Sequence, residues 1–443
     1  MEQMLPAGST IECVTLCEPL EVKRLLGAGG QGEVYEVNFF GEALAAKWYF
    51  PKIASRDKGL ADRLRDSIRS TSPGNAFLWP ISLLEPSARS CADLNIPEGS
   101  FGYLMRLRPE GYVGAIDHSA ARVSISIRSV VRACFQLAEA FDQLHSKGLC
   151  YKDISLGNIF LNPNSGDVLI CDNDNVEQNG RNRGLAVGTS GFMAPEVLLG
   201  QARPSAESDL FSMAVLMFHL LTRSDPLKGA LELEIRCLDE PARRRLYGED
   251  PVFIYDPDDH RNRPDPEVHQ AAVITWPIYP RQLQQLFEKT FGVGIRNPSA
   301  RVLTGQWCEA LASCLDQRLI CPHCGQESFA THGQSSHCWA CEKDIESPML
   351  LKAGHGEVFA QPENELYPHH FNAFIAERIN DPVARVQSHP SDPNILGLEN
   401  LSNVLWTATY ANGQSVEVPP GKRCSLNQVS NIKTNLGVVA LER

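Results

Sequence analysis

The sequence predicts an α+β protein made of four successive regions. Residues 21–109 hold short apolar runs typical of strands, and residues 110–316 change to helical periodicity. Paired cysteines mark residues 317–347, and residues 348–443 return to strand-like alternation. Because the chain has 443 residues, 43% of them hydrophobic, it can fill the cores of about three domains.

The first region is predicted to be a small antiparallel sheet covered by one helix. Its strands are expected at residues 22–26, 34–39, 43–50, 78–84 and 103–107. The helix is expected over Leu60, Leu64 and Ile68, which recur every four residues. Residues 1–20 carry no motif and are expected to form a lead-in strand.

Net charge and the absence of long apolar runs exclude several classes of partner. The formal net charge of −12 disfavours nucleic acid as a partner. No basic segment followed by an apolar segment opens the chain, and the longest apolar run, at residues 213–221, is too short to span a bilayer. We therefore expect a cytoplasmic protein with no nucleic-acid and no membrane partner.

Six short motifs stand in a fixed order within the first two regions. They are GAGGQGEV at 27–34, AAK at 45–47, YKDISLGN at 151–158, VLICD at 168–172, GTSGFMAPE at 188–196 and SDLFS at 208–212. A single motif of this length arises by chance, but an ordered series of six does not. Together they resemble the serine/threonine branch of the protein-kinase superfamily over roughly residues 21–315.

This resemblance implies a bilobal protein-kinase fold that uses ATP and Mg²⁺, with a small lobe over 21–109 and a large lobe over 110–316. Asp153 would accept or orient the proton of the substrate hydroxyl, while Asn158 and Asp172 would bind Mg²⁺. The implied catalytic set is Asp153, Lys47, Asn158 and Asp172. The implied ATP contacts are Gly27, Gly29, Gly32, Val34, Ala45, Lys47, Asp66 and Met105.

Lys47 would contact the α and β phosphates, and the family pairs this lysine with a glutamate of the small-lobe helix. No Glu lies between Lys47 and Glu85, so Asp66 is the carboxylate nearest to the partner position. An aspartate reaches less far than a glutamate, so either the helix lies closer or the pair forms only in an activated state. The alternative is that Asp66 is a surface charge.

Two departures from the family pattern affect the expected rate. DND at 172–174 replaces D-F-G, and Ser155 stands where serine/threonine kinases place a lysine that neutralises the transferring phosphate. No Ser, Thr or Tyr lies between Asn173 and Gly188, so phosphorylation of a hydroxyl within that stretch is excluded. Thr189, Ser190 or a partner protein remain as control points, and a partner protein is favoured. We expect a slow or conditional serine/threonine kinase; the alternative is a pseudokinase scaffold that binds nucleotide and partners without efficient turnover.

Other matching positions have expected supporting roles. Thr189 should bond Asp153, Asp209 should hold the backbone of the catalytic loop, and Glu196 should pair with Arg301. The segment at 194–196 and Asp209 also disfavour a small-molecule kinase of the aminoglycoside type, because that group lacks this segment.

Two C-x2-C pairs within residues 317–347 predict a structural zinc ribbon. Cys321 and Cys324 form one pair and Cys338 and Cys341 the other, and four thiolates complete a tetrahedral Zn²⁺ site. The less favoured alternative replaces one thiolate by His332 or His337.

The last region, residues 348–443, is expected to be a small β-domain. Alternating residues on both sides of Asn412-Gly413 predict a hairpin with a type I′ turn. The region faintly resembles the C-terminal half of a forkhead-associated domain. The YKDIS loop, DPLKG at 225–229, YGEDPVF at 247–253, the zinc ribbon and the β-domain together resemble bacterial kinases of tellurite-resistance-type stress triads. This resemblance implies a protein substrate, with a metal-dependent protein phosphatase and a von Willebrand A protein as partners.

Overall fold

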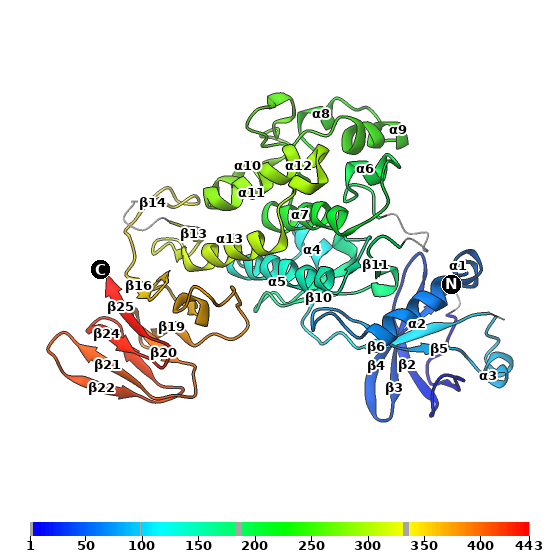
Figure 1. Ribbon diagram of the computed structural model, residues 1–443, viewed down its shortest axis with the longest axis horizontal. Coiled ribbons are helices and arrows are strands. Elements are labelled where there is room, and N and C mark those ends of the chain that lie inside the picture. The colour runs from blue at the N-terminus through cyan, green and yellow to red at the C-terminus, as the bar shows by residue number, and fades with distance from the viewer. Residues whose placement is uncertain (1–2, 98, 182–187, 331–335, 443) are drawn as a thin grey trace.

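The computed structural model describes residues 3–97, 99–181, 188–330 and 336–442. A sheet-rich small lobe, in blue, lies at one end of the molecule, and a β-sandwich, in red, lies at the other (Figure 1). The helical large lobe lies between them, and a cysteine-containing unit leads from its last helix to the sandwich.

The small lobe is a six-stranded antiparallel sheet in the order β1-β2-β3-β4-β6-β5. Its strands are β1 (Thr10–Ile11), β2 (Leu20–Ala28), β3 (Gly32–Phe39), β4 (Glu42–Tyr49), β5 (Pro80–Leu84) and β6 (Gly102–Arg106). The helices are α1 (Pro51–Arg56), α2 (Leu60–Ser70) and α3 (Ala88–Asp93). Alternation along β4 sends Ala45 and Tyr49 toward α2, where Leu64 packs, and sends Trp48 to the opposite core.

The N-terminal segment differs from the predicted lead-in strand. Only β1 is a strand, and the coil around it buries Leu5 and Cys13 in the core on the outer face of the sheet. The backbone N–H of Leu5 donates to the Tyr35 hydroxyl at 3.0 Å. The small lobe therefore begins well before residue 21, because alternation along β3 and β4 leaves an apolar face that the N-terminal residues cover.

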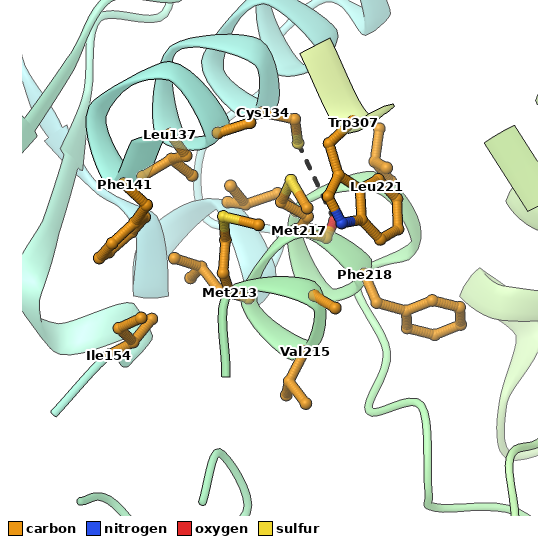
Figure 2. Close-up of a cluster of buried hydrophobic side chains, with 14 of the residues drawn as sticks. Cys134, Leu137, Phe141, Ile154, Met213, Val215, Met217, Phe218, Leu221 and Trp307 are labelled. Carbon is orange, nitrogen blue, oxygen red and sulfur yellow. Dashed lines mark hydrogen bonds between the residues drawn. The ribbon is translucent and has the colours of Figure 1, made fainter. Parts of the chain in front are cut away.

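The large lobe is built mainly on helices. They are α4 (Ala115–Ser119), α5 (Ile127–Ser146), α6 (Pro195–Leu198), α7 (Ala206–Thr222), α8 (Ala230–Leu233), α9 (Glu240–Arg244), α10 (Gln270–Thr275), α11 (Arg281–Phe291), α12 (Val293–Arg296) and α13 (Thr304–Asp316). Figure 2 shows Phe141 of α5, Phe218 of α7 and Trp307 of α13 within one apolar cluster. Since α7 is apolar on nearly all sides, it is the buried centre of this lobe. In the described part of the chain, every helix is too short or too polar to cross a bilayer.

Two small sheets at the face toward the small lobe carry the motif loops. One sheet contains β7 (Val113–Gly114), β9 (Ile159–Leu161) and β10 (Val168–Ile170), and the other pairs β8 (Leu149–Cys150) with β11 (Glu177–Gln178). The short 3₁₀ turns η1 (Leu156–Asn158) and η2 (Asn173–Asn175) follow β8 and β10. These turns place the predicted Mg²⁺ ligands at the boundary between the lobes.

Two short hairpins follow α13. They are β12 (Arg318–Ile320) with β13 (Glu327–Phe329), and β14 (Ser336–His337) with β15 (Asp344–Ile345). The remaining chain forms two sheets that share one core containing Leu398, Trp406 and Ile432. The six-stranded sheet contains β16 (Leu350–Ala353), β17 (Gly356–Phe359), β21 (Trp406–Tyr410), β22 (Ser415–Val418), β24 (Val429–Lys433) and β25 (Val438–Glu442). The four-stranded sheet contains β18 (Glu365–Leu366), β19 (Ala384–His389), β20 (Asp392–Asn400) and β23 (Arg423–Ser425).

The predicted hairpin around Asn412-Gly413 is confirmed as the β21–β22 pair, but its turn type was wrong. The loop has three residues, and among these three, all of them described, only Gly413 has a positive φ, of 83°. The N–H of Gly413 donates to the Tyr410 carbonyl at 2.9 Å, and the N–H of Tyr410 donates to the Gln414 carbonyl at 2.8 Å. This is a type I turn completed by a left-handed glycine, because a type I′ turn needs two positive φ angles.

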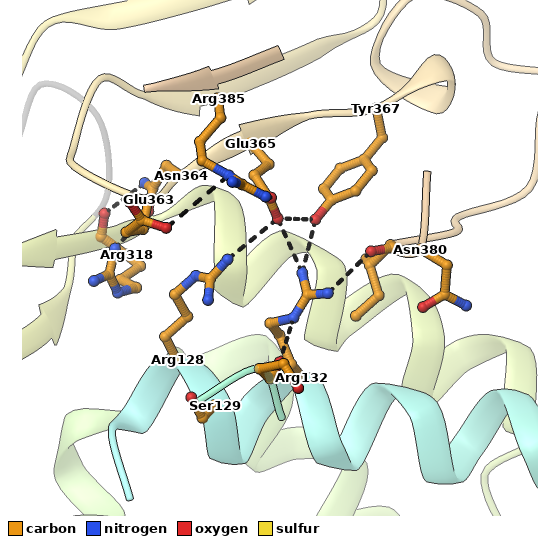
Figure 3. Close-up of polar contacts among 12 residues, drawn as sticks. Arg128, Ser129, Arg132, Arg318, Glu363, Asn364, Glu365, Tyr367, Asn380 and Arg385 are labelled. Atoms are coloured by element: carbon orange, nitrogen blue, oxygen red, sulfur yellow. Dashed lines mark hydrogen bonds and ion pairs between the residues drawn. The ribbon is translucent and has the colours of Figure 1, made fainter. Parts of the chain in front are cut away.

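A buried charge cluster attaches the sandwich to the large lobe (Figure 3). Glu365 of β18 accepts from Arg128 at 3.3 Å and Arg132 at 3.0 Å, both on α5, and from Arg385 at 2.7 Å. Tyr367 donates to the same carboxylate at 2.5 Å. Burial alone would raise the pKa of Glu365, but the Tyr367 hydroxyl and the three guanidinium groups outweigh burial and lower that pKa. The Glu365 carboxylate thus accepts hydrogen bonds from cations of both the large lobe and the sandwich.

Glu365→Gln should lower the free energy of unfolding by about 3–5 kcal/mol, because Arg128 and Arg132 would remain buried without their carboxylate. Urea unfolding measures this change. The matched control is Glu363→Gln, whose side chain is 51% exposed and lies 4.0 Å from Arg385; it should stay within about 0.5 kcal/mol of the wild type. Equal effects of the two changes would contradict the assignment.

Candidate active site

A cleft of about 710 Å³ lies between the lobes. Its lining includes five of the predicted nucleotide and metal contacts, namely Gly27, Val34, Ala45, Met105 and Asp172. Phe160 and Leu107 add apolar surface, and Asp172 places a partly exposed carboxylate in the lining. Such a lining can accept a flat apolar ring while a charged group sits near Asp172.

The three predicted phosphate-loop glycines are glycines for different reasons. A Cβ on Gly27 or Gly29 would meet open space, so a ligand can approach the backbone there. A Cβ on Gly32 would lie 2.1 Å from the carbonyl oxygen of Trp48. Gly32 is therefore required by the close approach of β3 to β4, and the packing of the strands alone accounts for it.

The catalytic loop is fixed from two sides. Asp209 of α7 accepts from the backbone N–H groups of Tyr151 at 2.6 Å and Lys152 at 2.9 Å, which confirms its predicted supporting role. The side chain of Asn158 donates to the carbonyl of Asp153 at 2.8 Å. Lys152 has a φ of 74°, a conformation rare for non-glycine residues and frequent at functional sites.

Asp153 is half-buried, and its carboxylate is oriented by a partner from the activation segment. The Thr189 hydroxyl donates to Asp153 Oδ1 at 2.6 Å, as predicted. The predicted ion pair between Glu196 and Arg301 is also confirmed, with two N–H···O bonds of 2.8 Å to a fully buried guanidinium. This pair lies away from the cleft lining and is structural.

Lys47 is 4% exposed and points its ammonium group into a cluster of acceptors. It donates to Asp174 Oδ2 at 2.7 Å, to Gln31 Oε1 at 3.0 Å and to Asp172 Oδ1 at 3.2 Å. Burial alone would lower the pKa of Lys47, but the carboxylates of Asp174 and Asp172 outweigh burial and raise that pKa. Lys47 is therefore held as a cation.

The structure does not bring Asp66 to Lys47 as predicted. Asp66 lies on an exposed face of α2, and the carboxylates that pair with Lys47 come from η2 and the residue before it. The face of α2 that points inward instead buries Arg63, which is 2% exposed. The prediction for Asp66 was wrong because the family pattern places the carboxylate on the helix, whereas here Asp174 of η2 pairs with Lys47.

Arg63 joins a second buried charge cluster beside the catalytic loop. It donates to both carboxylate oxygens of Asp57, at 2.9 and 2.6 Å, and lies 3.7 Å from Glu177. The ammonium of Lys152 also donates to Glu177, which is 3% exposed. Glu177 of β11 therefore links the small-lobe helix to the catalytic loop.

The four predicted cysteines converge between the two hairpins. Their sulfur atoms all lie within 4.8 Å of one another, with Cys321 to Cys341 at 3.7 Å and Cys324 to Cys338 at 3.5 Å. Tetrahedral Zn–S bonds of about 2.3 Å place sulfur atoms roughly 3.8 Å apart, so the donor set fits a zinc ion. Of the two histidine alternatives, His337 is exposed and pairs with Asp344, and His332 lies outside the described residues.

Sequence reasoning missed Gln31, Tyr49, Asp174, Glu177 and Arg63. One signal was available, because the second acid of the DND motif lies two residues after Asp172 and could reach the same lysine. For Glu177 and Arg63 the sequence offered no signal, because their meeting depends on how α2 packs against β11.

Comparison with known proteins agrees with the large-lobe motifs. Residues 110–265 match the model of the protein kinase domain. The serine/threonine-protein kinase PknA of Mycobacterium tuberculosis is 27% identical over 241 residues, which cover 52% of this chain and 53% of that protein. The chain thus matches only about half the length of this curated relative.

Two further similarities cover different shares of the chain. A cGMP-dependent protein kinase of Drosophila melanogaster, isozyme 2, is 38% identical over 96 residues, 21% of this chain and 10% of that protein. The solved structure of the Mycobacterium tuberculosis PknI kinase domain aligns with 18% identity and a TM-score of 0.44, covering 70% of this chain and 98% of that chain.

Glu177→Gln should lower the free energy of unfolding by about 3–5 kcal/mol, because Lys152 and Arg63 would keep buried positive charges without their shared carboxylate. Chemical denaturation measures the change. Glu207→Gln, on the exposed start of α7, is the control and should leave stability nearly unchanged. A Glu177→Gln protein as stable as the control would contradict a required charge cluster.

Proposed function

We propose that this chain is an ATP- and Mg²⁺-dependent protein serine/threonine kinase. The observation that carries the proposal is the joint placement of Asp153, oriented by Thr189, and of Asp172 and Lys47 beside a cleft large enough for a nucleotide. The match of residues 110–265 to the protein kinase domain supports the same reaction.

In this proposal each residue of the cleft has one task. Asp153 accepts or orients the proton of the substrate hydroxyl, and the Thr189 hydroxyl fixes the carboxylate for that task. Asn158 and Asp172 would hold Mg²⁺, which neutralises charge on the transferring phosphoryl group. Lys47 would bind the α and β phosphates, and Gly27 and Gly29 leave the backbone open to them.

We further propose that transfer is slow unless a partner assists. Ser155 supplies no positive charge at the position where a lysine is expected, and the ammonium of Lys152 is already bound to Glu177. One cation of this kind contributes orders of magnitude to a transfer rate. The same observation favours the second candidate, a pseudokinase scaffold that binds nucleotide and partners.

We propose that the four cysteines hold a structural Zn²⁺ and that the sandwich, which the charge cluster around Glu365 fixes to the large lobe, binds partner proteins. Membership in a stress-signalling triad with a von Willebrand A protein and a metal-dependent phosphatase, and the likeness to a forkhead-associated domain, stay predictions from the sequence.

Asp153→Asn should reduce phosphate incorporation from labelled ATP by at least about 100-fold, because the amide cannot accept the hydroxyl proton. The assay uses Mg²⁺ with and without candidate partner proteins, and Asp258→Asn, on an exposed loop, is the control expected to match the wild type. No incorporation by the wild type under any condition, despite nucleotide binding, would overturn the kinase in favour of the scaffold.

Cys338→Ser should lose most of the zinc that the wild type carries, because three thiolates no longer complete the tetrahedral site. Elemental analysis of the purified proteins measures metal per chain. Cys237→Ser removes an exposed cysteine outside the cluster and should retain full zinc content. Undiminished zinc in Cys338→Ser would exclude Cys338 as an essential ligand.

A further inference from the structure

The buried partner of Lys47 is Asp174, two residues after Asp172. The function proposed above gives Asp174 no task in the nucleotide site. Asp174 is 2% exposed, and its Oδ2 accepts from Lys47 at 2.7 Å. The other carboxylate on Lys47, Asp172, is partly exposed at 38% and lies farther away, at 3.2 Å. Asp174 is therefore the more enclosed and the closer of the two acids.

The hydrogen bonds that hold Asp174 in place come from the sheet. The Tyr49 hydroxyl donates to the same Oδ2 at 2.5 Å, and Tyr49 lies two residues after Lys47 on one face of β4. The neighbouring residue Asn173 is fully buried and donates to the carbonyl oxygens of Leu78 at 2.9 Å and Ile170 at 3.0 Å. The segment is thus fixed to both lobes by its own side chains.

We infer that Asp174 is the positioning residue that holds Lys47 toward the phosphates of the nucleotide, in place of a carboxylate from the small-lobe helix. This inference rests on the proposed function of the cleft. With a metal ion on Asp172, Lys47 would keep its bond to Asp174 and would be available to phosphate oxygens. Lys47, Asp172 and Asp174 together carry one net negative charge, which favours entry of a divalent cation.

A residue of α2 that paired with Lys47 would have to be negatively charged, but the inner face of α2 carries the positively charged Arg63. Arg63 of α2 points to Asp57 and Glu177. A movement of α2 would disturb the Arg63 cluster, whereas the hydrogen bonds to Asp174 come from Lys47 and Tyr49 of β4. The carboxylate partner of Lys47 is therefore not a residue of the helix.

The test compares Asp174→Asn with Asp66→Asn, since each change removes one carboxylate with little change of volume. Binding of a non-hydrolysable ATP analogue with Mg²⁺ is measured by calorimetry, together with KM and kcat where turnover occurs. Asp174→Asn should weaken binding roughly tenfold or more, because a charged hydrogen bond that orients Lys47 is lost. Asp66→Asn should stay within about twofold of the wild type, because the acceptors that hold Lys47 are Asp174, Gln31 and Asp172.

If Asp174→Asn does not fold, Tyr49→Phe keeps the carboxylate and removes only its hydroxyl donor; it should weaken nucleotide binding roughly threefold. Unchanged nucleotide binding in Asp174→Asn would overturn the inference, as would an equal loss of binding in Asp66→Asn. If the wild type transfers no phosphate but Asp174→Asn still binds the nucleotide more weakly than the wild type, the proposed kinase activity is rejected and the inference about Asp174 stands.

Discussion

Lys47 and Lys152 are buried lysines, and a buried ammonium group remains charged only when carboxylates face it. Both sets of carboxylates come from one short stretch, with Asp172 and Asp174 beside Lys47 and Glu177 beside Lys152. This stretch therefore cannot move far without exposing two unpaired charges. The arrangement of the cleft, of the catalytic loop and of the inner face of α2 depends on that electrostatic requirement.

A buried carboxylate that faces cations also connects the large lobe to the sandwich, at the pair of Arg132 and Glu365. Arg132 on α5 also donates to the carbonyl oxygen of Ser165, in the loop between β9 and β10. Glu365 thus orients a side chain that supports the loop between β9, which follows Asn158, and β10, which precedes Asp172. Two polar contacts and one short loop therefore join the sandwich to the strands beside these two residues.

The sequence alone predicted most of the architecture because apolar periodicity and motif order are local signals. The helix around Leu64, the four converging cysteines and the Thr189 bond to Asp153 all follow from spacing or from family pattern. The partner of Lys47 could not be predicted in this way. Which of Asp66 and Asp174 reaches the ammonium depends on the rotation of a helix against a sheet, and a linear pattern does not contain that angle.

Glu177 has a consequence for how the protein can be controlled. Kinase activation segments are commonly ordered when a phosphate is added and pairs with basic residues. Here the basic residues Lys152 and Arg63 already share a carboxylate that is part of the polypeptide. No phosphatase can remove that charge, so the contact of β11 with α2 and with the loop that carries Lys152 does not depend on a reversible modification.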